Sequence, residues 1–477
     1  MPAHTRLEHL GLWVLAAALY AWISPDGLLY WDSFGYVSQC AQGQVGGLML
    51  GRPLFVLLGH TIARITGLFS VDLAHLEPTL RAVCTLTAAL SAPLTAALAL
   101  SLGTSRAASR WAGLVVAASP AIAHAAGAVL TDGPALSATL AALCVAQRAQ
   151  HARHWLFAGA LFALSVGLRE PSISFGSVLV AIACAQERTT RVRALLLISL
   201  GFLLLAVPTL AWCWGQPGWR ESVLAWRVAM ARERLEPRSL LRDGAIYLGW
   251  LFALGPVALF AALRGWSQFR ALLGSWREAR FWVCTLSLAQ LILLAFYQDI
   301  SFSPRYLMAA FPGAIALVAG LVLAQVRTRA VTVAWVAAVL APALIAGPVL
   351  RRREAPLRSV IDSVPARLAH VATDTVIVTG QACPAVQLRR TIERIRLQNH
   401  SELQPRWVTV CPGWSWPNDL SQALAAHCTA GRPVLVDLRP QSYVGERQQR
   451  ALATLTQWAE RVRSDPREVC HARTTRW

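Results

Sequence analysis

The chain has 477 residues, of which 55% are apolar and only 14% are charged, whereas a soluble globular domain carries about 25% charged residues. All 44 basic residues are arginines, and together with 25 acidic residues they give a net charge of +19. Windows such as residues 111–130 and 194–215 carry no charge and are long enough to cross a hydrocarbon core about 30 Å thick. This pattern excludes a disordered chain, a fibrous protein and a nucleic-acid-binding module, and it indicates a membrane protein.

The apolar runs predict about eleven transmembrane helices, so the expected fold class is an all-α polytopic membrane protein. Arginines fall in alternate, mostly short connections, such as the one that holds Arg106 and Arg110. The positive-inside rule places these connections and the N-terminus, with Arg6, in the cytoplasm, and the chain after Leu350 outside. The expected spans are residues 10–24, 77–103, 109–130, 133–150, 155–168, 171–186, 193–214, 244–263, 281–298, 306–325 and 329–349.

Two apolar stretches near the start of the chain have more than one interpretation. Residues 10–24 could be a secretory signal peptide, but we expect an uncleaved anchor because the motifs that follow need this span in place. The stretch from Pro53 to Phe69 could be a twelfth span or a helix along the membrane interface. A twelfth span would turn the arginine-rich loops outward, so the charge rule favours the interfacial helix.

The first outer loop, residues 24–75, contains a carboxylate and a guanidinium that could carry chemistry. Asp32 lies among aromatic residues, including Tyr36, that favour the membrane boundary. It is either a helix cap, with Ser33, for a helix running to Gln42, or a general base. Arg52 could bind two phosphate oxygens at once or extend toward lipid headgroups.

Two later motifs place charged residues at the outer ends of predicted spans. Asp132 precedes Gly-Pro and is either a turn or N-cap residue or a second acidic residue of a substrate cavity. Arg169 and Glu170 precede Pro171 and form either a local ion pair or a pair that binds sugar or phosphate. His60 and His124 are expected to be hydrogen-bonded helix residues rather than metal ligands.

Further arginines lie on the outer side against the charge rule. Arg305, followed by Tyr306, lies after a short connection and needs an anionic partner, either Asp299 or a phosphate. A second outer segment, residues 216–243, contains six arginines. It is either a solvated helix with internal ion pairs or a segment that attracts an anionic lipid or polymer through residues such as Arg227 and Arg234.

The composition changes after Arg351, and residues 351–477 are expected to form a small extracytoplasmic α/β domain behind the membrane module of residues 1–350. Strands are predicted at residues 375–379, 407–411 and 433–438, and helices at 385–397, 420–430 and 445–462. This alternation favours a parallel sheet. The domain contains Cys383, Cys411, Cys428 and Cys470, for which three disulfide pairings are possible. The other cysteines are expected to be small buried residues.

Five motifs in this order resemble the GT-C superfamily of integral-membrane glycosyltransferases. The resemblance is to the glycosyltransferase family 39-like branch, which includes the protein O-mannosyltransferases and the lipid A aminoarabinose transferase, and it covers residues 10–325. The motifs are Asp32-Ser33-Phe34-Gly35-Tyr36, Gly51-Arg52-Pro53-Leu54, Leu130-Thr131-Asp132-Gly133-Pro134-Ala135-Leu136, Leu168-Arg169-Glu170-Pro171-Ser172 and Ser303-Pro304-Arg305-Tyr306-Leu307-Met308.

The resemblance implies an inverting transfer of a sugar from a polyprenyl-phosphate carrier to a lipid, glycan or protein acceptor at the outer membrane face. Asp32 would be the catalytic base, and Asp132 a second catalytic carboxylate. The substrate-binding residues implied are Arg52, Arg169, Glu170, Arg305, Tyr306 and Tyr36. Ser33 replaces the acidic residue that follows the aspartate in many relatives, so we expect no cofactor and no obligatory divalent metal.

A transporter or flippase for a lipid-linked sugar is the alternative function. Such a protein should carry charges in the middle of its spans and show repeated halves, whereas these motifs lie at outer helix ends. A membrane-anchored binding protein whose tail binds the ligand is a weaker alternative. The arginine-only, alanine-rich chain indicates a GC-rich bacterial genome. We therefore expect a protein of the bacterial plasma membrane and cell envelope, with membrane lipids and no nucleic acid as partners.

Overall fold

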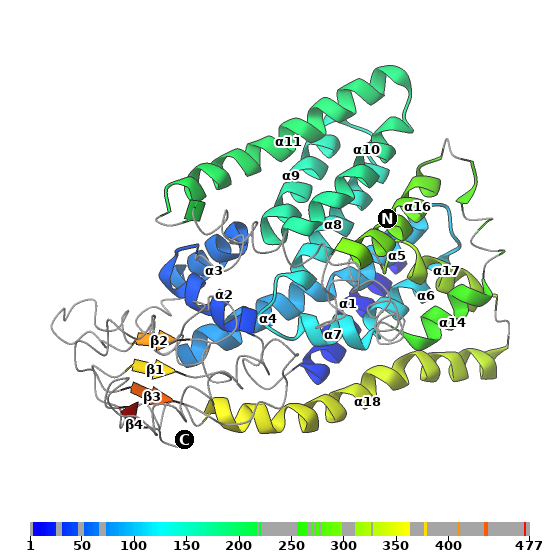
Figure 1. Ribbon diagram of the computed structural model, residues 1–477. Coiled ribbons are helices and arrows are strands. Elements are labelled where there is room, and N and C mark those ends of the chain that lie inside the picture. Colours follow the sequence, from blue (N-terminus) through cyan, green and yellow to red (C-terminus); the bar gives the residue numbers. More distant parts are fainter. Residues whose placement is uncertain are drawn as a thin grey trace.

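The structure is a computed structural model, and it describes the helical part of the chain with several gaps. The described residues are 3–24, 31–45, 52–65, 73–216, 255–265, 278–297, 311–325 and 328–362, a few positions between 219 and 275, and four short strands after residue 375. Figure 1 shows the helices gathered in one bundle, with the strands beyond the C-terminal end of the last long helix.

The described elements are almost all helical, as the sequence predicts. They are α1 (Ala3–Ile23), α2 (Trp31–Gln42), α3 (Pro53–Ile65), α4 (Leu73–Ala89), α5 (Ser91–Ser101), α6 (Arg106–Ala117), α7 (Pro120–Ala126), α8 (Asp132–Gln147), α9 (Ala152–Leu168), the 3-10 helix η1 (Glu170–Phe175), α10 (Gly176–Cys184), α11 (Arg188–Trp214), α14 (Pro256–Arg264), α16 (Ala279–Tyr297), α17 (Ile315–Leu323) and α18 (Arg329–Asp362).

Several expected spans are divided into shorter helices. The span predicted at residues 109–130 becomes α6 and α7, because the Ser119 side chain caps α7 by accepting a hydrogen bond from the Ile122 N–H at 3.5 Å. Pro120 follows at the first helical position, where its missing N–H costs nothing. By length and composition, three helical stretches in the described part can cross a membrane: Leu76–Ser101, Arg188–Trp214 and Arg329–Arg352. The count of eleven spans stays a prediction.

The described helix α3 is short, and the interfacial interpretation of the first outer loop stays a prediction. It has 13 residues, which corresponds to about 20 Å and is shorter than the about 30 Å of a hydrocarbon core. One face is buried through Val56 and Ala63, whereas Leu58 and Ile65 are exposed. Helix α3 packs on α2 and α9.

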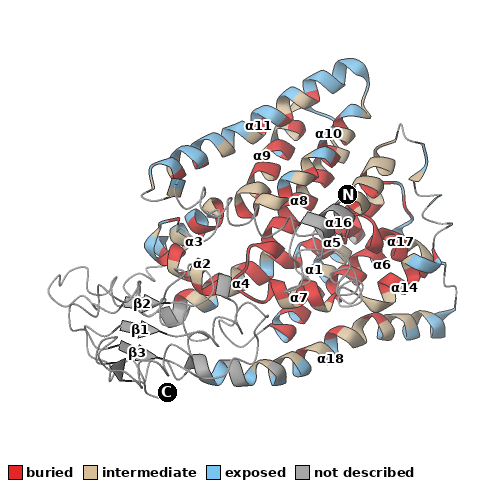
Figure 2. Ribbon diagram, in the orientation of Figure 1, coloured by how far each residue is buried: buried red, intermediate tan, exposed pale blue. Residues whose placement is uncertain are grey.

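The centre of the bundle is α8, which is buried along nearly its whole length (Figure 2). It packs against α4, α5, α9 and α10. Small side chains permit this packing, as is common between membrane helices. The contact between α9 and α11 depends on two glycines, because a Cβ atom on Gly159 would overlap the Ile198 carbonyl and one on Gly201 would overlap the Leu156 carbonyl.

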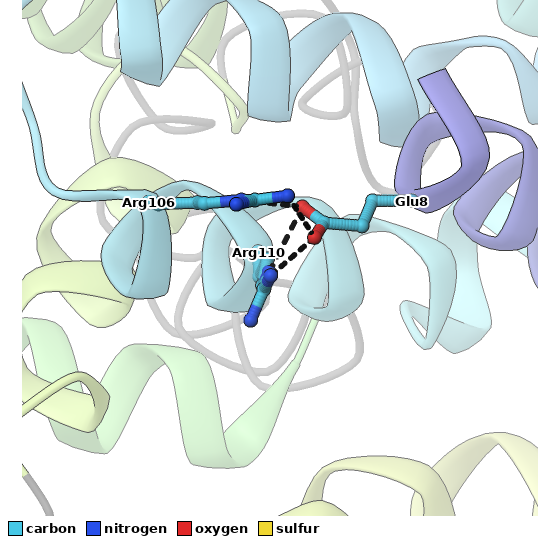
Figure 3. A network of polar contacts seen from close by, with 3 residues as sticks. All are labelled: Glu8, Arg106 and Arg110. Atoms are coloured by element: carbon cyan, nitrogen blue, oxygen red, sulfur yellow. Dashed lines mark hydrogen bonds and ion pairs between the residues drawn. The ribbon is translucent and has the colours of Figure 1, made fainter. Parts of the chain in front are cut away.

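One end of the bundle is arginine-rich. Figure 3 shows the guanidinium groups of Arg106 and Arg110 converging on the carboxylate of Glu8. The Arg106 Nη2 atom lies 2.5 Å from Glu8 Oε1, and the Arg110 Nε atom lies 3.0 Å from Oε2. The structure therefore places the N-terminal end of α1 beside the first arginine-rich connection, where the sequence predicts both on one membrane side.

At the opposite end, α18 is attached to α1 and α7. The Arg351 guanidinium lies 4.6 Å from the centre of the Trp22 ring and donates a hydrogen bond to the Trp22 carbonyl at 2.6 Å. His124 Nε2 lies 2.7 Å from a Glu354 carboxylate oxygen. Helix α18 continues to Asp362, past the position 350 at which the sequence predicts the membrane module to end.

The tail contains a parallel sheet of four short strands, β1 (Val376–Val378), β2 (Val408–Val410), β3 (Val434–Val436) and β4 (Ala472–Arg473), in the order β2-β1-β3-β4. Val376 pairs with Val408 on one side and with Val434 on the other. The three predicted strands and their parallel pairing are confirmed, and β4 was not predicted. The predicted tail helices and the four tail cysteines lie outside the described residues.

Candidate functional site

The first group of the site joins the two helices of the first outer loop to η1. Arg52 directly precedes α3, and its Nε–H donates to the Tyr36 hydroxyl of α2 at 3.0 Å. Its Nη1 atom forms an ion pair with Glu170 at the start of η1. Helix α3 approaches α9 closely because Gly167 leaves room for Leu54. Arg52 therefore contacts two other predicted site residues, Tyr36 and Glu170.

The second group is an ion pair between Asp132 and Arg169. Asp132 is the first residue of α8, and Arg169 follows the last residue of α9. Both side chains are only 6% exposed. Removing one partner of such a pair leaves a buried charge without compensation, so this pair firmly connects the ends of α8 and α9.

The local ion pair between Arg169 and Glu170 that the sequence allowed is not formed. Each of these neighbours has another partner, Asp132 for Arg169 and Arg52 for Glu170. The reason is the backbone, because Arg169 is extended (φ −156°, ψ 113°) and adjacent side chains on an extended backbone point in opposite directions. The turn interpretation of Asp132 is likewise incomplete, since its carboxylate contacts Arg169.

Asp32 is the second residue of α2, which begins at Trp31. It therefore lies in the first turn of this helix, and not ahead of it as the cap interpretation expects. Tyr36, which contacts Arg52, is four residues later, about one helical turn along α2.

Other predicted residues are accounted for as follows. Arg305, Tyr306, Arg227 and Arg234 lie outside the described residues. His60 Nδ1 lies 2.9 Å from the Cys40 carbonyl, and His124 contacts Glu354, so the prediction that both are hydrogen-bonded is confirmed. The cysteines at positions 40, 84, 144, 213 and 284 are buried and free, as expected, whereas Cys184 is exposed.

A pair of hydroxyl groups beneath the site was missed in the sequence. Thr139 Oγ1 of α8 lies 2.6 Å from Ser165 Oγ of α9, and Ser165 Oγ also donates to the Ala135 carbonyl at 2.9 Å. Ser165 is one turn before Arg169, whose N–H donates to the Ser165 carbonyl at 2.8 Å. The available signal was the presence of hydroxyl residues in two consecutive apolar spans.

Three buried polar atoms of the site region have no hydrogen-bond partner among the residues that the structure describes. They are Ser33 Oγ, Thr131 Oγ1 and Glu170 Oε1. Buried polar groups are usually satisfied. Each of the two hydroxyls belongs to a residue next to a predicted catalytic aspartate, so these atoms could bind the hydroxyl groups of a substrate.

Within the described part of the chain, no three His, Cys, Asp or Glu side chains lie together in a group that could hold a metal ion. The expectation that the protein needs no divalent metal stays a prediction.

The chain is similar to a known protein family in sequence and to solved structures in fold. Residues 57–186 match the sequence model of a family described as dolichyl-phosphate-mannose-protein mannosyltransferase. This segment contains Asp132, Arg169 and Glu170 but neither Asp32 nor Arg52. Among curated proteins, none matches this chain in sequence.

Several solved structures are similar to the chain, and they include ArnT and AglB. ArnT from Cupriavidus metallidurans, bound to undecaprenyl phosphate, is 13% identical with a TM-score of 0.53, and the match covers 97% of this chain and 89% of ArnT. The archaeal oligosaccharyltransferase AglB from Archaeoglobus fulgidus, in complex with an inhibitory peptide and a dolichol-phosphate, is 12% identical with a TM-score of 0.48. That match covers 80% of this chain and 63% of AglB, so the chain spans less than two thirds of AglB.

The likeness to ArnT extends over nearly the whole chain and shows a shared fold. The family match lies on residues 57–186, the segment that holds the buried ion pair. Both findings agree with the resemblance of the sequence motifs to GT-C glycosyltransferases.

Proposed function

We propose that this protein transfers a sugar, with inversion, from a polyprenyl-phosphate-linked donor to a lipid, glycan or protein acceptor at the outer face of a bacterial plasma membrane. The observation that carries the proposal is a set of two neighbouring groups, Tyr36–Arg52–Glu170 and Asp132–Arg169, which are linked through the adjacent residues 169 and 170. The likeness to ArnT, whose structure contains bound undecaprenyl phosphate, supports the class of carrier.

Arg52 is the residue we assign to the carrier phosphate. A guanidinium has five N–H donors, of which the Tyr36 hydroxyl and the Glu170 carboxylate contact two. The remaining donors can bind phosphate oxygens in a bidentate manner. The positive charge of the guanidinium stabilises the phosphate as it leaves as an anion, so no acid is needed to protonate it.

Asp32 is the residue we assign to the base. Its position one helical turn before Tyr36, the tyrosine that contacts Arg52, supports this assignment. Here it would take the proton of the acceptor hydroxyl as that oxygen attacks the anomeric carbon. Asp132 is less suited to this role because its carboxylate is engaged by Arg169 in a buried pair.

Asp132 and Arg169 are therefore proposed to position the substrate. They join the ends of α8 and α9 next to the buried hydroxyl of Thr131, which has no hydrogen-bond partner among the described residues. A sugar hydroxyl could form a hydrogen bond with the Thr131 hydroxyl.

Arg305 and Tyr306 stay predicted substrate-binding residues. The sheet beyond the C-terminal end of α18 (Figure 1) is proposed to be an extracytoplasmic domain that engages the acceptor.

The test is transfer of labelled sugar from a panel of polyprenyl-phosphate sugars in membranes that contain matched amounts of wild type or Asp32→Asn. We expect the wild type to transfer at least one sugar and the variant to be slower by about 100-fold or more, the typical contribution of a general base. Glu187→Gln is the control, because Glu187 is an exposed carboxylate that precedes α11; it should leave transfer unchanged.

Equal transfer by wild type and Asp32→Asn would contradict the assignment of the base. Transfer by none of the proteins, together with movement of the lipid-linked sugar across vesicles that contain the wild type, would favour the flippase alternative.

A further inference from the structure

A groove distinct from the candidate site lies between α1, α5 and α8. Its volume is about 540 Å³, within the range of about 300–1,000 Å³ that is usual for small-molecule sites. Its walls are apolar and include Trp13, Leu90 and Leu94, whereas its two basic lining residues are His9 and Arg148. The groove is therefore amphipathic, with an apolar length and a polar part.

The polar part lies at the arginine-rich end of the bundle. His9 is adjacent in sequence to Glu8, which contacts Arg106 and Arg110 (Figure 3). Arg148 directly follows α8. Trp13 lies one helical turn deeper along α1 than His9, and its indole N–H donates to the Leu86 carbonyl at 3.0 Å. The groove thus extends from the arginine-rich end toward the middle of the bundle.

The groove opens to the outside of the bundle, because the side chains of Leu10 and Leu90 at its edge are 53% and 41% exposed. In a membrane these leucines face lipid. The Arg148 guanidinium is held at the groove by a hydrogen bond from its Nη2 atom to the Ala97 carbonyl at 2.9 Å. A fixed cation at the end of an apolar, lipid-facing groove complements an amphipathic anion.

We propose that this groove binds one anionic phospholipid of the cytoplasmic leaflet. The acyl chain lies along Trp13, Leu90 and Leu94, and the headgroup phosphate binds Arg148 with a further contact from His9. Juxtamembrane basic residues attract anionic lipids in this way. The proposal depends on the predicted orientation, with the arginine-rich end in the cytoplasm, and it is independent of the donor assigned to the candidate site.

The experiment is native mass spectrometry of the full chain in detergent, titrated with phosphatidylglycerol, phosphatidylcholine or undecaprenyl phosphate. We expect one phosphatidylglycerol to bind more tightly than phosphatidylcholine, and undecaprenyl phosphate to bind independently of Arg148. Arg148→Gln should weaken phosphatidylglycerol binding by about fivefold, the contribution of one basic residue near an anionic headgroup. Leu90→Trp, which narrows the groove without changing its charge, should weaken it as well.

Arg153→Gln is the matched control, because Arg153 is exposed near the start of α9 and does not line the groove. It should bind phosphatidylglycerol as the wild type does, and so should Arg52→Gln at the candidate site. Equal loss of phosphatidylglycerol binding in Arg148→Gln and Arg153→Gln, tighter binding of phosphatidylcholine than of phosphatidylglycerol, or an Arg148→Gln variant that loses undecaprenyl phosphate binding as strongly as phosphatidylglycerol binding would overturn the proposal. Because the readout is binding, a failure of sugar transfer does not affect it.

Discussion

The two ends of the helical bundle both hold arginine–carboxylate pairs, but they differ in burial. At the arginine-rich end, Arg106 and Arg110 are about half exposed where they contact Glu8. At the site, Asp132 and Arg169 are almost completely buried. Exposed ion pairs contribute little to stability, whereas a buried pair is costly to break. Breaking an ion pair should therefore cost little stability at the arginine-rich end and much more at the candidate site.

The largest expected effect comes from breaking the buried pair. Arg169→Gln leaves the Asp132 carboxylate buried without its counter-ion, which should destabilise the protein by about 3–5 kcal/mol. Thermal unfolding in detergent measures the effect. The double variant Asp132→Asn with Arg169→Gln should recover part of the loss, because it also removes the uncompensated charge. An unchanged midpoint for Arg169→Gln would show that the pair does not join α8 to α9.

The next largest effect is expected at the partly exposed Arg52, where a substitution should weaken donor binding but change stability little. Arg52→Gln removes a charged donor, and hydrogen bonds to charged groups contribute about 1.5–3 kcal/mol. We expect the KM for the polyprenyl-phosphate donor to rise by about 10- to 100-fold, with little change in thermal stability. Arg64→Gln is the control, since Arg64 is an exposed residue near the end of α3, the helix that Arg52 precedes. Equal KM values for both variants would contradict the phosphate assignment.

A smaller effect is expected at the hydroxyl pair beneath the site. Ser165→Ala removes the contacts with Thr139 and the Ala135 carbonyl, so the free energy of unfolding should fall by about 0.5–1.5 kcal/mol. Ser177→Ala is a suitable control, because Ser177 is exposed on α10 and contacts only the nearby Ser174 carbonyl among the described residues. If Ser165→Ala lowers the free energy of unfolding no more than the control does, the hydroxyl pair contributes nothing to stability.

The exposed cluster at the arginine-rich end should show a small, pH-dependent effect. Hydrogen bonds from Arg110 and Arg106 lower the pKa of Glu8 from 4.5 to about 2. Because the folded-state pKa is depressed, the stabilisation is fully present above pH 4.5 and is lost as the pH falls toward 2. Glu8→Gln should lower the thermal midpoint slightly at pH 7, and this difference from wild type should vanish near pH 2. A constant difference across this range would contradict the prediction.

The smallest expected effect is that of metal removal. Ser33 stands next to Asp32, so the first loop lacks two adjacent carboxylates that could share a divalent cation. Treatment with EDTA should leave sugar transfer unchanged. A loss of transfer that Mg²⁺ or Mn²⁺ restores would show that the protein needs a metal.

Several features were accessible from sequence because they depend on local patterns. The apolar runs predicted the helical fold, and the arginines at positions 106 and 110 predicted a connection on the same side as the N-terminus, which the structure places beside them. β-Branched runs bounded by Gly or Pro predicted β1, β2 and β3. The helix breaks at Ser119 and Pro120 were missed, because hydropathy averages over a window and does not register a single cap.

The sequence by itself determined which residues form the candidate site, since charges at helix ends in an apolar chain are few and stand out. Only the tertiary structure decided their partners. Arg169 and Glu170 are neighbours in the chain, yet the extended backbone at residue 169 directs one toward Asp132 and the other toward Arg52. Such pairing depends on how α3, α8 and α9 pack, and packing is set by contacts between segments that lie far apart in the sequence.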